Sequence, residues 1–132
     1  MNEQQPFELP IMVRGYEMDA FGHVNNAVFA QYFEHCRWMA LRQWSQQWMT
    51  ETAAIVVKKL SIEYEAQARV FDELTIRLWV EAIGRTSMTF GQDLRRSDSG
   101  EPVAKAEVVV VCVDGSGSPR EVPDSWRRAL EE

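Results

Sequence analysis

The sequence predicts an α+β domain in which an antiparallel sheet curls around one long helix. Three observations lead to this prediction. One segment of about twenty residues carries apolar side chains at spacings of three and four, which is the period of a helix. Five other segments alternate apolar and polar residues or are rich in valine, as strands are. The turns between the later strand segments are short, which suits antiparallel neighbours.

The first strand and the helix follow each other closely along the chain. Residues 7–16 place Leu9, Ile11 and Val13 at alternate positions, which predicts a strand. Residues 26–47 are predicted to form the helix, whose apolar stripe consists of Phe29, Tyr32, Phe33, Cys36, Ala40 and Trp44. Other apolar residues lie off that stripe, namely Val28, Trp38, Met39 and Leu41. The helix is therefore apolar around most of its circumference, and such a helix is expected to be buried.

Four more strands and a short helix complete the chain. The strands are predicted at residues 55–64, 73–83, 86–96 and 103–113, and the short helix begins after Pro123 and ends near Leu130. No repeat or linker divides residues 1–132, which are predicted to form a single domain. A sheet that curls around the helix leaves two edges. Pairing of edges between two copies would protect them, so a dimer at least is expected.

Composition and charge narrow the possible functions. The net charge of −6 disfavours binding to nucleic acid or to an anionic membrane surface. Cys36 and Cys112 lie in apolar surroundings and are expected to be buried thiols, and the sequence shows no metal-ligand spacing. The N-terminal residues lack the features of a signal peptide, and no apolar run approaches the roughly 18 residues of a membrane span. A cytoplasmic protein is expected.

One polar segment between the first strand and the helix, RGYEMDAFGHVNNA at residues 14–27, raises a functional question. Asp19 precedes His23 by four residues, and Asn25 and Asn26 stand at the predicted helix start. Acids and asparagines before a helix commonly cap it. The same helix end presents unpaired backbone N–H groups, which suit a developing oxyanion. The segment is therefore either a capped helix start or a reaction centre.

The residues DAFGHVNNA at 19–27, followed by Tyr32-Phe33-Glu34 and Arg37, resemble the hotdog-fold acyl-CoA thioesterases of the 4-hydroxybenzoyl-CoA thioesterase-like family. The longer stretch VRGYEMDAFGHVNNA is most similar to the long-chain acyl-CoA thioesterase branch, and the resemblance extends over most of the chain. It implies a hotdog fold, in which a five- or six-stranded antiparallel sheet wraps a long central helix. It also implies a homodimer or homotetramer that hydrolyses an acyl-CoA thioester without a metal or redox cofactor.

The resemblance gives each polar residue of the segment a candidate role. Asp19 is expected to act as the general base that activates water or as the nucleophile that forms a mixed anhydride. His23 either supports Asp19 and the leaving thiol or holds the turn. Backbone N–H groups near Asn25 and Asn26 are expected to polarise the thioester carbonyl, and Gly22 permits an unusual backbone angle or a close approach of the substrate.

Several alternatives stay open. Glu34 is a second catalytic candidate, because another hotdog branch carries its catalytic glutamate on the helix. The plant-type acyl-ACP thioesterases have an asparagine two residues after the acid, where this chain has Phe21. An acyl-ACP thioesterase is nevertheless the enzyme alternative, and a non-catalytic acyl-CoA-binding module is the other. A medium or long acyl chain is expected, although Trp38, Met39, Trp44 and Trp48 fit packing in the core or at an interface better than an acyl tunnel.

Overall fold

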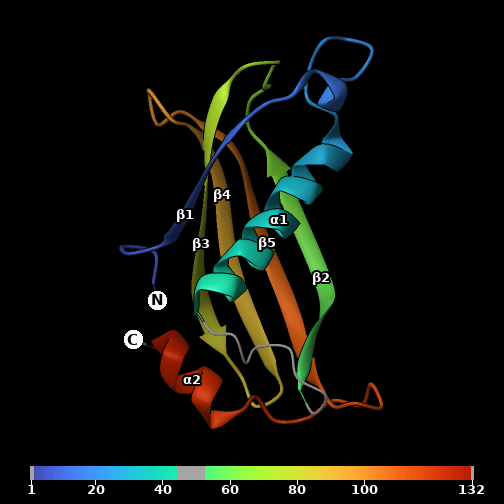
Figure 1. The fold of residues 1–132 in the computed structure, drawn as a ribbon, viewed down its shortest axis with the longest axis vertical. Coiled ribbons are helices and arrows are strands. Elements are labelled where there is room, and N and C mark those ends of the chain that lie inside the picture. Colours follow the sequence, from blue (N-terminus) through green and yellow to red (C-terminus); the bar gives the residue numbers. More distant parts are fainter. Residues whose placement is uncertain (1, 45–52, 132) are drawn as a thin grey trace.

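The computed structural model describes residues 2–44 and 53–131 of the chain. The elements follow the predicted order (Figure 1): β1 (Phe7–Met12), a 3₁₀ turn (Gly15–Glu17), α1 (Asn26–Trp44), β2 (Ala54–Tyr64), β3 (Glu73–Ile83), β4 (Ser87–Arg96), β5 (Pro102–Val113) and α2 (Asp124–Glu131). The predicted long helix, the five strands and the C-terminal helix are therefore confirmed. The last predicted helix residues, 45–47, and Trp48 lie outside the described residues.

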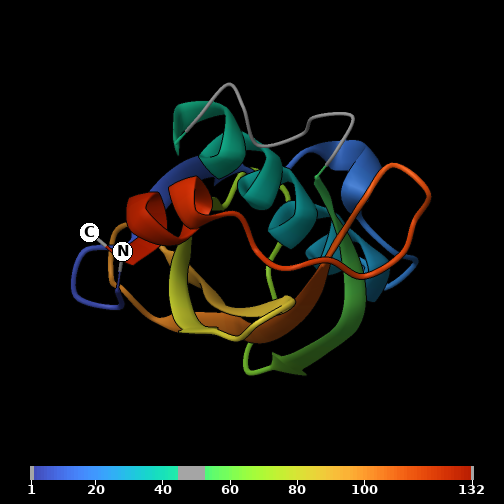
Figure 2. The ribbon, with the colours of Figure 1, turned by 90° about the horizontal axis from the view of Figure 1, so that it is seen from below.

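The strands form one antiparallel sheet in the order β1-β3-β4-β5-β2. Figure 2 shows this sheet curving beneath α1, with α2 beside α1 on the same side. The α+β prediction and the hotdog arrangement of a long helix against a five-stranded antiparallel sheet are confirmed. Strands β1 and β2 lie at the two edges, so each has one side without a strand partner among the described residues.

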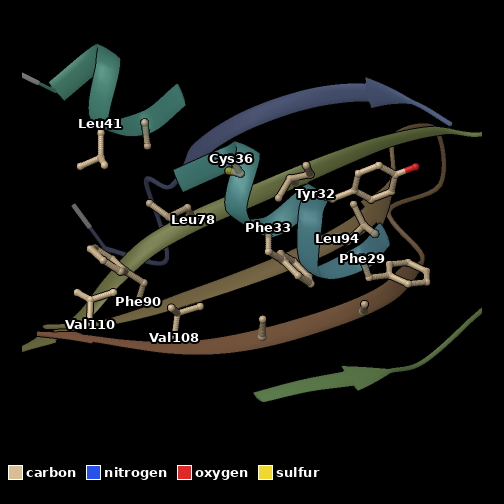
Figure 3. Close-up of a cluster of buried hydrophobic side chains, with 14 of the residues drawn as sticks. Phe29, Tyr32, Phe33, Cys36, Leu41, Leu78, Phe90, Leu94, Val108 and Val110 are labelled. Carbon is tan, nitrogen blue, oxygen red and sulfur yellow. The ribbon is translucent and has the colours of Figure 1, made fainter. Parts of the chain in front are cut away.

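The core lies between α1 and the concave face of the sheet (Figure 3). Phe33 and Cys36 on α1 are completely buried, and they meet side chains such as Leu78, Leu94 and Val108 from three strands. Full burial of a side chain the size of Phe33 stabilises the fold by about 1.5–3 kcal/mol. This packing fixes α1 on the sheet and therefore fixes the position of its N-terminus.

The helix is buried on one side only, which corrects the expectation that it is buried around most of its circumference. Trp38 is 53% exposed, whereas the charged Arg37 beside it is only 8% exposed. The reason is that a single sheet covers one face of α1, and the opposite face has no neighbouring layer within the described chain (Figure 2). Core packing of Trp38 is therefore wrong for this single chain, and packing of Trp38 at an interface stays a prediction.

Strand β1 is shorter than predicted, since it ends at Met12 rather than at residue 16. Its partner β3 begins at Glu73, which pairs with Met12, and Val13 makes the last backbone hydrogen bonds between the two segments, with Asp72 and Phe71. The Arg14 N–H then donates to Oε1 of Glu17 at 2.8 Å, and the chain turns into the 3₁₀ segment. A side chain that accepts a backbone N–H bond thus replaces the sheet at this point.

The two cysteines are buried and not joined in a disulfide, as predicted. Burial raises the pKa of the Cys36 thiol to about 12 and also raises the pKa of Cys112. Both are therefore neutral thiols at physiological pH. Among the described helices, none has the length and apolar character needed to cross a bilayer.

Candidate active site

The candidate site is built on the loop between β1 and α1, residues 17–25, drawn in blue in Figure 1. Three backbone contacts close this loop. The N–H of Asn25 donates to the Glu17 carbonyl at 3.0 Å, Met18 pairs with Val24, and the N–H of Asp19 donates to the His23 carbonyl at 2.7 Å. We name residues 17–25 the Asp19 loop. The loop is a small closed unit that leads directly into the first turn of α1.

Gly22 makes the tip of the Asp19 loop possible. Its φ of +78° lies in the left-handed region, where residues other than glycine are strained. No other atom lies within 4 Å of the position that a Cβ would occupy, so the requirement for glycine is conformational rather than steric. The sequence expectation of an unusual backbone angle at Gly22 agrees with this geometry.

Asp19 uses one carboxylate oxygen to shape the loop. Its Oδ1 accepts the N–H of Phe21 at 2.8 Å and the N–H of His23 at 3.2 Å. These two backbone hydrogen bonds, from His23 and Phe21, lower the pKa of Asp19 below its ordinary value. The carboxylate is therefore ionised at neutral pH, and no described residue donates a hydrogen bond to its Oδ2. That second oxygen is available to a water molecule or a substrate.

The start of α1 separates the roles of the two asparagines. The Asn25 side chain caps the helix, because its Oδ1 accepts the N–H of Ala27 at 2.9 Å. The N–H of Asn25 itself is used by Glu17. The N–H of Asn26, in contrast, makes no hydrogen bond with any residue that the structure describes. Of the two positions named from the sequence, Asn26 is thus the one whose backbone donor is open at the positive end of the helix dipole.

His23 is held between the Asp19 loop and the segment that joins β2 to β3. Its Nε2 lies 3.4 Å from Nη2 of Arg69, and the neighbouring Val24 N–H donates to the Ala68 carbonyl at 2.8 Å. A guanidinium can only donate, so Nε2 is the acceptor in any hydrogen bond between these two side chains. The His23 ring and the Val24 backbone therefore both connect the loop to the segment between β2 and β3.

Glu34 lies apart from the Asp19 loop. It is eight residues beyond Asn26, which corresponds to about 12 Å along the axis of α1. It lines a groove of about 110 Å³ between α1 and β2, together with Arg37, Trp38, Leu41, Ile55 and Val57. The structure thus gathers Asp19, Gly22, His23, Asn25 and Asn26 into one loop and helix start, and it places Glu34 elsewhere.

The sequence patterns missed Glu17, a buried acid at the base of the Asp19 loop. It is 6% exposed, and its carboxylate accepts hydrogen bonds from Arg14 and from the hydroxyl of Tyr32 on α1. Arg37 was named from the sequence only as part of a resemblance, yet it is buried and donates to the neutral Gln92 side chain at 3.0 Å. Tyr32 is 15 residues from Glu17 and Gln92 is 55 residues from Arg37, so no short-range pattern could have predicted these two pairs.

Comparison with known proteins gives the same family as the sequence motif. A sequence profile of the "Thioesterase-like superfamily" matches residues 13–130. The long-chain acyl-CoA thioesterase FadM of Escherichia coli K12 is 37% identical over 106 residues, which cover 79% of this chain and 80% of FadM. The acyl-CoA thioester hydrolase YbgC of Escherichia coli O6:H1 is 37% identical over 123 residues, which cover 90% of this chain and 91% of YbgC.

A solved structure agrees with the fold over nearly the whole chain. The crystal structure of YbaW, a probable thioesterase from Escherichia coli, superposes with a TM-score of 0.86 at 32% identity. The superposition covers 94% of this chain and 96% of YbaW. With the profile match over residues 13–130 and two relatives at 37% identity, this chain belongs to the thioesterase-like superfamily.

Proposed function

We propose that this chain is an acyl-CoA thioesterase that hydrolyses the substrate to a free carboxylic acid and coenzyme A. Two relatives, FadM and YbgC, are named for this activity, as a long-chain acyl-CoA thioesterase and an acyl-CoA thioester hydrolase. One observation carries the proposal. Asp19 has an ionised carboxylate with one oxygen that no described residue bonds, and the same loop leads to Asn26, whose backbone N–H has no described acceptor. Thioester hydrolysis needs both of these groups, a base or nucleophile and a donor for the oxyanion.

The Asn26 N–H binds the thioester carbonyl oxygen in this mechanism, and the helix dipole stabilises the negative charge that develops there. On the general-base route, Asp19 takes a proton from water as the water oxygen bonds to the carbonyl carbon. The C–S bond then breaks, and the thiolate of coenzyme A recovers a proton from Asp19. On the nucleophilic route, Oδ2 of Asp19 bonds to the carbonyl carbon, the thiolate leaves, and water opens the mixed anhydride.

His23 supports this arrangement in the proposal. Its backbone N–H and carbonyl both bond to Asp19, so its position sets the angle of the carboxylate. Its ring, held by Arg69, is placed on the side of the loop that faces the segment between β2 and β3. The acyl group is proposed to be a medium or long chain, in line with the name of FadM and with the apolar groove along α1.

We further propose that the active form is a homodimer, or a tetramer built from it, with the β2 edge at the interface. Apolar residues on this edge are exposed, namely Val56, Val57, Leu60 and Tyr64, and Trp38 is exposed on the neighbouring helix. Arg37 is buried in the groove beside them, and no described carboxylate forms an ion pair with it. A second copy seated on this edge would cover the apolar side chains and complete the unpaired strand. Two free buried thiols suit a reducing compartment, so the proposal places the protein in the cytoplasm.

The decisive experiment measures thiol release from acyl-CoAs of C4 to C18, benzoyl-CoA and 4-hydroxybenzoyl-CoA, with wild type and Asp19→Asn side by side. The substitution keeps the side-chain size and removes the carboxylate, so kcat is expected to fall by about 10²–10³ or more. Equal activity of the two proteins would exclude Asp19 as the catalytic carboxylate and leave Glu34 as the candidate. If neither protein cleaves any acyl-CoA, the same assay with acyl-ACP separates the carrier-protein enzyme from a binding module.

A further inference from the structure

The Glu17 carboxylate accepts three hydrogen bonds from described residues, one more than the carboxylate of Asp19. Its Oε1 accepts the backbone N–H of Arg14 and the hydroxyl of Tyr32, each at 2.8 Å, and its Oε2 accepts Nη2 of Arg14 at 2.9 Å. Burial alone would raise the pKa of Glu17, but the hydrogen bonds from Arg14 and Tyr32 outweigh it and the pKa is lowered. Glu17 is therefore a buried, ionised and fully paired carboxylate.

These contacts connect the base of the Asp19 loop to the side of α1. The carbonyl of Glu17 accepts the N–H of Asn25, the residue that caps the helix, at 3.0 Å. The side chain of Glu17 reaches Tyr32, which lies on the second turn of the same helix. Glu17 thus closes the loop at Asn25 through its carbonyl and ties the loop to α1 at Tyr32 through its side chain. Asp19 follows two residues later in the chain.

The other contacts of the loop lie within it, at the first turn of α1 through the Asn25 cap, or on the segment between β2 and β3. Met18 pairs with Val24, and Asp19 bonds to the backbone of Phe21 and His23, so these links persist when the Glu17 carboxylate is removed. The hydrogen bond from Tyr32 to Glu17, in contrast, is the described side-chain bond that ties the loop to the second turn of the helix. The proposed reaction depends on how the loop lies relative to the helix, because the attacking group is on the loop and the oxyanion donor is on the helix.

We infer that Glu17 is a positioning residue for thioester hydrolysis. Through its hydrogen bond with Tyr32, it holds the Asp19 carboxylate in a fixed position relative to the Asn26 N–H. This inference rests on the proposed function. A displacement of about 1 Å between reacting groups can reduce the rate about 10²-fold, so a loosened loop affects turnover strongly. Substrate binding depends on the loop less, because most of an acyl-CoA lies outside it. The signature of the role is a loss in kcat with little change in KM.

The test compares steady-state thiol release by wild type, Glu17→Gln, Tyr32→Phe and the double variant, using the acyl-CoA that wild type cleaves fastest. Glu17→Gln is expected to lower kcat about 10- to 100-fold and to change KM by less than about threefold. Tyr32→Phe is expected to lower kcat by about 10-fold. Because the two side chains act as one unit, the double variant should be no slower than Glu17→Gln alone.

Asp93→Asn is the matched control. Asp93 is a partly buried carboxylate whose Oδ2 lies 2.6 Å from Nη2 of Arg77, on strands β4 and β3, and it has no contact with the Asp19 loop. This variant is expected to lower the melting temperature and to keep the wild-type kcat, which separates general destabilisation from positioning.

Three results would overturn the inference. They are an unchanged kcat in Glu17→Gln, a kcat loss in Asp93→Asn that matches its loss of stability, or a change confined to KM. If Glu17→Gln does not fold, Tyr32→Phe decides, and wild-type kcat in that variant counts against the inference. A wild type that cleaves no thioester at all overturns the proposed function, and this inference with it.

Discussion

Asp19 commits only one of its two carboxylate oxygens to its own loop. Many acids that precede a helix accept the first N–H groups of that helix and have no other task. In this chain the Asn25 side chain does that capping, so Asp19 is not needed for it. Because Asn25 caps the helix, the carboxylate of Asp19 is left with an oxygen for a chemical role.

The backbone donor at Asn26 can be tested with proline. Proline is tolerated at the first position of a helix, so Asn26→Pro should fold while it removes the N–H that we assign to the carbonyl oxygen. We expect kcat to fall about 10²–10³-fold, the usual effect of losing one oxyanion donor. Asn26→Ala is the control, because it keeps the N–H and removes a side chain for which the structure gives no hydrogen bond. Equal loss in both variants would assign the role to the side chain.

Gly22 allows a comparison with a second glycine of the same backbone angle. Gly22 and Gly100 have φ values of +78° and +75°, and neither has an atom within 4 Å of its Cβ position. Alanine at either site should therefore lower the free energy of unfolding by a similar amount, about 1 kcal/mol, measured by urea titration. Only Gly22→Ala is expected to reduce kcat, because Gly100 lies in the turn between β4 and β5. A matching kcat loss in Gly100→Ala would disprove a special role for the loop tip.

The residues of the Asp19 loop could be named from the sequence because they are contiguous. Asp19, Gly22, His23, Asn25 and Asn26 span eight positions, so their proximity follows from one turn and one helix start. The pairing of Glu17 with Tyr32 could not be read in the same way, since it requires the loop to fold back on the helix. The sequence also could not say which of the two asparagines keeps an open N–H, because that depends on where the Glu17 carbonyl points.

The periodicity of the sequence predicted the helix and the strands correctly, but it predicted their first and last residues less accurately. The bounds of β3 were predicted correctly, because apolar residues recur at every second position from Leu74 to Val80. The end of β1 was not, because a strand continues only while its partner does, and β3 begins at Glu73. The exposed side of α1 was also unpredictable, since an apolar pattern does not say whether the covering layer comes from the same chain.

The junction between β1 and α1 should show a specific pH dependence through Glu17. Its pKa is lowered from the ordinary 4.5, so its ionised form stabilises the folded state at all pH values above that point. This contribution is lost as the pH falls through the lowered pKa. We therefore expect the difference in melting temperature between wild type and Glu17→Gln to be constant from about pH 8 to pH 5 and to shrink below the ordinary value. A difference that stays constant down to pH 3 would mean that the Glu17 charge is not involved.

In the whole molecule, the β2 edge combines exposed apolar side chains with a side that has no strand partner among the described residues. A carboxylate in place of an exposed apolar side chain removes apolar contact area from an edge, so Leu60→Glu is expected to convert the proposed dimer to a monomer in sedimentation experiments. Met12→Glu is the control, because Met12 is similarly exposed on the opposite edge, at the end of β1. A monomeric wild type, or a dimer that survives Leu60→Glu but not Met12→Glu, would contradict the proposed interface.

The burial of both cysteines has a consequence for a molecule that releases a thiol at every turnover. Cys36 and Cys112 are fully buried, and their raised pKa values keep them protonated. A protonated, inaccessible sulfur does not attack an oxidised coenzyme A dimer, so the protein should not accumulate mixed disulfides with its own product. For the same reason, colorimetric thiol reagents should react with released coenzyme A and not with the native protein. The absorbance in the proposed assays should therefore report coenzyme A alone.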